Sequence, residues 1–110
     1  MLIYQWSAIP RQDCWSSARR LIHTFVQVSG VALDWPSGTV MVTGREAVAR
    51  TLSVEFAFDG VKAFEAAWQR LLAHEATGEL WARLQPLLEA DSVRRSVYDV
   101  QYSRAGRLET

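Results

Sequence analysis

Three side chains of this chain could move a proton in a reaction, and they lie far apart in the sequence: Glu55, Asp99 and His23. Glu55 stands between two apolar residues in the alternating stretch 51–58, so its carboxylate points to the polar side of a strand. A carboxylate that is shielded from water has a raised pKa and can act as a general acid or base. We therefore predict Glu55 as a candidate catalytic base, and we expect Asp99, in a second alternating stretch, to share its space.

His23 is the third catalytic candidate, because an imidazole titrates near neutral pH. On a helical pattern it lies between Arg20 and Gln27, which places it on a polar face. Simple solvent exposure is the alternative, and the sequence favours it. The second histidine, His74, stands beside Glu75 and is expected at a loop surface.

Polar side chains alternate with apolar ones along the same stretches, and they would line one face of a sheet. A small molecule bound against that face would meet amide, hydroxyl and carboxylate groups. The candidate ligand-binding residues are Gln5, Ser7, Ser53, Glu55, Asp99 and Gln101. The alternative is that these groups hydrogen-bond one another or water at a subunit interface, and the sequence favours this reading because shifted carboxylates are often structural.

Metal and cofactor sites have no support in the sequence. Two histidines and one cysteine are far apart, with no pair at the spacing of metal ligands. Glycine-rich phosphate loops and nucleophile-elbow motifs are absent. We therefore expect no metal and no cofactor. The single cysteine, Cys14, excludes an intramolecular disulfide and is expected to be a buried, inert thiol on the apolar side of a helix.

Charge and hydropathy exclude further classes of partner. Twelve basic residues balance twelve acidic ones, and the basic residues are scattered, so we expect no nucleic-acid partner. No apolar run approaches the ~20 residues of a membrane span, and the first strand pattern begins directly after Met1. We expect a cytoplasmic protein with no membrane partner.

Three segments with a period of two predict β-strands: 2–8, 51–58 and 95–102. Their apolar faces would carry Leu2, Tyr4, Trp6 and Ala8, then Leu52, Val54, Phe56 and Phe58, then Tyr98, Val100 and Tyr102. A β-branched run over 39–43 predicts a short further strand. Residues 44–49, which include Arg45 and Glu46, would form a hairpin loop.

Helical spacing predicts a first helix over residues 10–28 that begins at Pro10 and stops at Ser29-Gly30. Four of the five tryptophans fall on apolar helix stripes or on the apolar face of a strand, and we expect them in the core: Trp6, Trp15, Trp68 and Trp81. Trp35 has no core position in this pattern. It would cover a pocket mouth or pack against a partner subunit, and the second is favoured.

A second helical region follows the 51–58 strand. Asp59 is a good N-cap for it, and the apolar spacing falters at 74–78. Thr77 would cap a further helical piece, whose end Pro86 disturbs.

The predicted elements follow the order βαββαβ, which is the order of the ferredoxin-like fold, a four-stranded antiparallel sheet with both helices on one face. The segments 52–60 (LSVEFAFDG), 64–68 (FEAAW), 78–88 (GELWARLQPLL) and 92–98 (SVRRSVY) resemble those of small bacterial proteins of the dimeric α+β barrel superfamily and of NIPSNAP-like domains. The resemblance implies an α+β fold and a homodimer whose protomers press their open sheet faces together around a barrel that often holds a small molecule.

The expected organisation is one domain over residues 1–103 and a flexible C-terminal tail over 104–110. The predicted function is the binding of a small molecule in the lumen of the dimeric barrel. The alternative, also implied by the resemblance, is a cofactor-independent enzyme such as a monooxygenase or polyketide cyclase acting on an aromatic or carbonyl compound.

Overall fold

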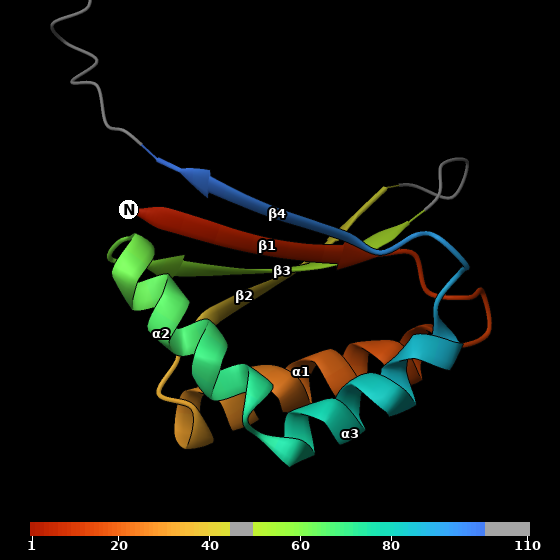
Figure 1. Cartoon of the computed structure of the whole chain (residues 1–110). Helices are drawn as coiled ribbons and strands as arrows, with labels where there is room; N and C mark the ends of the chain where they lie inside the picture. The colour runs from red at the N-terminus through yellow and green to blue at the C-terminus, as the bar shows by residue number, and fades with distance from the viewer. Residues whose placement is uncertain (45–49, 101–110) are drawn as a thin grey trace, which may run out of the picture.

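The structure is a computed structural model that describes residues 1–44 and 50–100. Figure 1 shows the strands as one layer, with the helices packed against one side of it. The elements are β1 (Leu2–Ala8), α1 (Trp15–Ala32), β2 (Gly38–Thr43), β3 (Thr51–Phe58), α2 (Val61–Leu72), α3 (Glu75–Leu84), the 3-10 turn η1 (Gln85–Leu87) and β4 (Arg94–Asp99). No helix within the described ranges is long and apolar enough to cross a membrane.

The strands form one sheet in the order β2-β3-β1-β4, and every neighbouring pair is antiparallel. This arrangement confirms the predicted α+β, ferredoxin-like βαββαβ fold. β1 and β3 are the central strands and pair over their whole length, from Leu2 opposite Phe58 to Ala8 opposite Leu52. β2 and β4 are the edges. The break between α2 and α3 confirms that the second helical region is interrupted near His74.

The central strands present alternate residues to the helices, as their sequence pattern predicts. Since successive side chains of a strand point to opposite faces, one set faces the helices and the other faces away from them. The set of β1 and β3 that faces the helices is buried and consists of Leu2, Tyr4, Trp6, Ala8, Leu52, Val54, Phe56 and Phe58. On the opposite face, Ile3 and Ser53 are also buried.

The prediction for β4 is wrong by one residue. Trp6 pairs with Arg95 and Leu2 pairs with Asp99, so these two β4 residues face the helix side. Tyr98 pairs with Ile3 and therefore points to the open side. A shift of one residue exchanges the two faces of a strand, and burial enforces the register only where one face is covered. All six residues of β4 are exposed, so burial does not select either face.

Two boundaries of α1 differ from their prediction. The helix begins at Trp15 and runs through Ser29 and Gly30 to Ala32. Pro10 lies before the helix and forms an isolated β-bridge with Leu88. Ser29 is fully buried, and its hydroxyl donates a hydrogen bond to the backbone oxygen of Val26. A serine whose hydroxyl bonds back to its own helix adds no unpaired polar group, so the helix continues.

The predicted caps of the later helices are also wrong. Gly60, not Asp59, precedes α2, and no side chain caps that helix. His74 precedes α3, and Thr77 lies inside it. Asp59, the residue before Gly60, is exposed.

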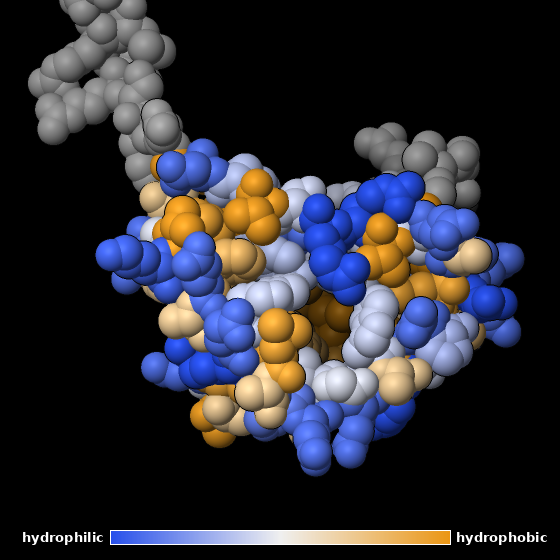
Figure 2. Space-filling view, in the orientation of Figure 1, coloured by the Kyte–Doolittle hydropathy of each residue, from blue (hydrophilic) through white to orange (hydrophobic). Residues whose placement is uncertain are grey.

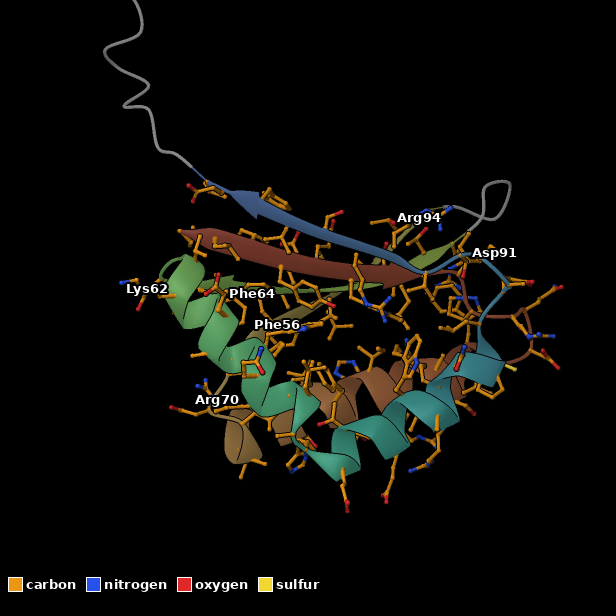
Figure 3. All side chains as sticks on the ribbon, viewed as in Figure 1. Phe56, Lys62, Phe64, Arg70, Asp91 and Arg94 are labelled. Carbon is orange, nitrogen blue, oxygen red and sulfur yellow. The ribbon has the colours of Figure 1, made fainter. Side chains whose placement is uncertain are left out.

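Trp35 is part of the core, against the prediction of a surface position. Its exposed fraction is 4%, and its ring packs edge-on against Phe56 at 5.0 Å and Phe58 at 5.4 Å. The indole N–H donates a hydrogen bond to the backbone oxygen of Ala67 at 3.0 Å. Figure 3 shows Phe56 in the space between the sheet and the helices. The short connection after α1 thus carries its aromatic ring inward to meet β3 and α2.

Cys14 is half-buried at the start of α1 and lies outside the buried set of that helix. Partial removal from water, followed by the hydrogen bond and charge of Asp13, raises the pKa of its thiol. The predicted loop residues Arg45 and Glu46, the candidate Gln101 and the tail 104–110 lie outside the described residues.

Candidate functional site

The open face of the sheet holds part of the predicted set. Gln5 and Glu55 are direct partners across β1 and β3, and the Gln5 side-chain amide donates to Glu55 Oε1 at 3.1 Å. The Tyr98 hydroxyl donates to the same oxygen at 3.2 Å. The pKa of Tyr98 is raised by partial removal from water, then by this hydrogen bond and by the carboxylate charge. Ser7 and Ser53 pair with each other on the same face.

The other two catalytic candidates lie elsewhere. Asp99 is on the helix side of β4, with its Oδ1 3.5 Å from the amino terminus, and its side chain is 65% exposed. The expectation that it shares the space of Glu55 is therefore wrong. His23 is exposed on α1. The structure brings Gln5, Glu55, Ser7 and Ser53 together and keeps Asp99 and His23 away from them.

A cavity lies on the other side of the sheet, between the strands and the helices. Its volume is about 140 Å³. Figure 2 shows its mouth as a hollow with hydrophobic residues at the floor. Its lining is mostly aromatic and aliphatic and consists of Tyr4, Trp6, Leu21, Ile22, Phe25, Trp35, Val54, Trp68, Leu71, Thr77, Leu80, Trp81, Leu84 and Arg95. Glu55, Asp99 and His23 are not part of this lining.

The walls of the cavity are held by edge-on aromatic contacts. Trp6 of β1 meets Trp81 of α3 at 6.3 Å, with the ring planes perpendicular. Tyr4 meets Trp68 of α2 at 5.5 Å. Edge-to-face pairs of this kind are favourable beyond the area that they bury, because the positive ring edge meets the negative ring face. These contacts join the sheet to α2 and α3 around the cavity.

Arg95 supplies a positively charged side chain to the lining of the cavity. Its guanidinium carbon lies 5.2 Å from the centre of the Trp81 ring, within the range of a cation–π contact. Burial raises the pKa of Tyr4, while the charge of Arg95 and a hydrogen bond from it act in the opposite direction. No carboxylate of the described residues forms a salt bridge with Arg95. The guanidinium therefore stands beside a phenol and an indole, with capacity for an anionic partner.

A second polar group reaches the cavity from the helix side. Thr77 lies in the lining, and its Oγ1 is 3.0 Å from His74 Nδ1. Both side chains are half-buried. Neither this pair nor Arg95 was predicted from the sequence as part of a site. The spacing of His74 and Thr77 at a helix start can be read from the sequence, but the cavity that Thr77 lines cannot. Among the described residues, no group of three or more His, Cys, Asp or Glu side chains is placed to hold a metal ion.

Solved structures with this arrangement come from several bacteria. A NIPSNAP family protein from Agrobacterium tumefaciens superposes with a TM-score of 0.68 at 11% identity, over 93% of this chain and 88% of that one. A putative antibiotic biosynthesis monooxygenase from Deinococcus radiodurans gives 0.64 at 13% identity, over 94% and 96%. The chain shares the ferredoxin-like α+β fold of these proteins. The resemblance expected from the sequence is thereby confirmed at the level of the fold.

A third solved structure of similar fold is described by its chemistry. A mutant of SnoaB, a cofactor-independent oxygenase from Streptomyces nogalater, superposes on this chain with a TM-score of 0.66 at 8% identity, over 94% of this chain and 96% of that one. No protein-family model matches the sequence, and a comparison with curated proteins finds no significant match. At these identities the superpositions show the fold of this chain alone, and its activity must be argued from its own residues.

Proposed function

We propose that the protein binds a small aromatic molecule with an oxygen anion, in the cavity between its own sheet and helices. The observation that carries this proposal is Arg95, a cation without a described carboxylate partner in an otherwise aromatic wall. Pockets for small molecules combine apolar walls with a few polar groups that set orientation. Here Arg95 and Tyr4 supply those groups from the sheet side.

The size of the cavity selects the class of ligand. Its volume is about 140 Å³. An apolar cavity of roughly 150 Å³ is large enough to bind benzene. The enclosed part of the site therefore accommodates one aromatic ring, with any further substituent directed toward the mouth. Aromatic walls meet such a ring by the same edge-on and stacked contacts that they make with one another.

A cofactor-independent enzyme acting on an aromatic or carbonyl compound is the second candidate. The fold likeness to an oxygenase of that kind supports it. Arg95 supports it as well, because a cation held over an aromatic ring at the cavity stabilises the phenolate or enolate that forms when such a substrate loses a proton. The binding proposal needs only the ligand, whereas this candidate also needs a group that accepts the proton.

The open face of the sheet is proposed as the contact between two copies of the chain. No helix of the described residues covers it, and it carries Tyr98, which is 44% exposed. A symmetric pair is the commonest way to bury one such surface. In that dimer the proposed ligand-binding residues Gln5, Ser7, Ser53 and Glu55 would line the space between the sheets. The bonds of Glu55 to Gln5 and Tyr98 would orient its carboxylate there.

Two neighbouring arginines provide the test of the cavity. Arg95 lines the cavity, whereas Arg94 pairs with Ser7 on the opposite face. Figure 3 shows Arg94 on the side away from the helices. Binding of 4-nitrophenol and of nitrobenzene is measured by quenching of tryptophan fluorescence. Arg95→Gln should weaken binding of the phenolate by roughly 10- to 100-fold, the range for a hydrogen bond to a charged group.

Arg94→Gln is the matched control and should leave both affinities unchanged. Nitrobenzene has no anionic oxygen, so Arg95→Gln should change its affinity much less than that of the phenolate. If the wild-type protein binds neither compound, or if both arginine variants weaken the phenolate equally, the proposed site is wrong.

A further inference from the structure

The break between α2 and α3 places an imidazole directly behind the cavity wall. Thr77 is a lining residue of α3, and His74 is the residue that precedes this helix. Their side chains meet at 3.0 Å, Oγ1 to Nδ1, and the backbone N–H of Thr77 donates to the backbone oxygen of His74 at 3.2 Å. The backbone contact fixes the two residues relative to each other, so the side-chain contact does not depend on a distant element.

This contact differs from an ordinary helix cap. A cap side chain normally accepts a hydrogen bond from a backbone N–H of the first turn. The His74 side chain makes no such bond. It meets instead the hydroxyl of a residue that reaches the cavity. A threonine hydroxyl can donate to one partner and accept from another at the same time, so Thr77 is able to connect a molecule in the cavity with the imidazole.

We propose that Thr77 and His74 form a proton-accepting pair for a phenolic or enolic hydroxyl bound in the cavity. This inference rests on the proposed function and adds the group that accepts the proton. The ligand O–H bond breaks and its proton passes to Thr77 Oγ1, while the Thr77 hydroxyl proton passes to His74 Nδ1. The products are a ligand oxygen anion, an intact threonine hydroxyl and an imidazolium. No oxidant or further reactant takes part.

The rest of the cavity suits this step. Arg95 extends from the sheet layer and Thr77 from the helix layer, so a flat ligand between them has a cation on one side and a proton acceptor on the other. Arg95 and Tyr4 are the other titratable groups of the lining. Glu75, the residue after His74, is exposed. A substrate that contacts both Arg95 and Thr77 would be a hydroxylated aromatic compound whose anion is delocalised over the ring.

The ionisation of bound 4-nitrophenol tests the pair, because phenol and phenolate absorb at different wavelengths. Thr77→Val removes the hydroxyl at nearly constant shape, and His74→Asn keeps a residue that is favoured at a helix start but cannot take the proton. In both variants the ratio of phenolate to phenol in the bound probe should fall about tenfold at fixed pH, which corresponds to one pKa unit of the probe. Thr77→Ser should restore the ratio of the wild type.

Two controls separate the explanations. Binding of 4-nitrophenol and of nitrobenzene to the wild type, measured by tryptophan quenching, reports on the proposed function alone, and the absence of both would overturn both proposals. Thr24→Val makes the same substitution on α1, outside the lining, and should leave the probe spectrum unchanged. If both probes bind and Thr77→Val gives the spectrum of the wild type, the pair has no role in proton transfer. If His74→Asn fails to show a cooperative thermal transition, this variant is not folded. The comparison of Thr77→Val with Thr77→Ser then tests the role of the pair in proton transfer.

Discussion

The two faces of the sheet are built from the same strands and hold different chemistry. The face toward the helices carries aromatic rings and one guanidinium around a cavity, whereas the other face carries amide, hydroxyl and carboxylate groups around Glu55. Arg94 and Arg95 show the contrast in its simplest form. They are neighbours on β4, but only Arg95 lies over Trp81. The face of the strand to which an arginine points, rather than its residue type, therefore decides whether it can contact a molecule in the cavity.

Two tyrosines extend this comparison. The pKa of Tyr4 is raised by burial, against the charge and hydrogen bond of Arg95. The pKa of Tyr98 is raised by partial removal from water and then by the hydrogen bond and charge of Glu55. One phenol therefore stands beside a cation and the other beside a carboxylate. An anionic ligand is attracted to the first environment and repelled by the second, because opposite charges favour and like charges oppose each other.

The largest difference between the faces is expected in stability. Phe56 is fully buried, with its ring 5.0 Å from Trp35. Phe56→Ala should lower the free energy of unfolding by about 3–5 kcal/mol, as a large-to-small change in a core. The neighbouring Glu55→Gln lies on the open face and keeps most of its hydrogen-bonding capacity, so its effect should stay below about 1 kcal/mol. Urea denaturation measures both, and effects of equal size would remove the distinction between the faces.

The next effect concerns association. Ala57 is exposed on the open face opposite Ile3. In the proposed dimer, Ala57→Arg would add a bulky cation to each of the two opposed sheets, and like charges across an interface cost several kcal/mol. Sedimentation equilibrium should then show a dissociation constant raised by on the order of a hundredfold or more. Ala63→Arg, at an exposed position of α2, is the control and should not alter association. A wild-type protein that is already monomeric would contradict the dimer.

A smaller effect is expected at the inward-pointing connection after α1. Trp35→Phe keeps an aromatic ring but removes the N–H that donates to the oxygen of Ala67. Loss of this hydrogen bond costs about 0.5–1.5 kcal/mol, and the smaller ring also leaves a cavity beside Phe56 and Phe58. Trp15→Phe is the comparison, because Trp15 is half-buried against the core and its indole makes a cation–π contact with Arg50, worth about 1 kcal/mol or less. Thermal or urea unfolding would contradict the buried position if the Trp15 variant were the less stable of the two.

The smallest effect is a dependence of stability on alkaline pH. Both tyrosines have a pKa raised from the ordinary value of 10.0. A folded-state pKa above the unfolded value means that the folded protein holds the proton more tightly, so this contribution is complete below pH 10.0 and declines as pH rises through the folded-state pKa. Tyr4→Phe should show a smaller alkaline loss of stability than the wild type. An identical pH profile for the two proteins would mean that burial of Tyr4 does not shift its titration.

The central strands and the overall fold could be predicted from the sequence because their alternation coincides with burial on one face. The register of β4 could not, because this edge strand is exposed along its whole length and its apolar residues do not mark a buried side. Trp35 was missed because its burial depends on β3 and α2, which lie far along the chain. The sequence pattern identified polar groups on the open face, but it contains no signal for a cavity whose wall combines Arg95 of β4 with Thr77, Leu80, Trp81 and Leu84 of α3.

The location of a bound aromatic compound is the most direct test of the proposed site, and proton–nitrogen correlation spectra of labelled protein measure it. The indole N–H groups of Trp68 and Trp81 report on the cavity, and the side-chain amide of Gln5 reports on the open face. On titration with 4-nitrophenol, the two indole signals should shift in a saturable manner while the Gln5 amide stays in place. Saturable shifts of the Gln5 amide with unchanged indole signals would place the ligand between the sheets and contradict the cavity site.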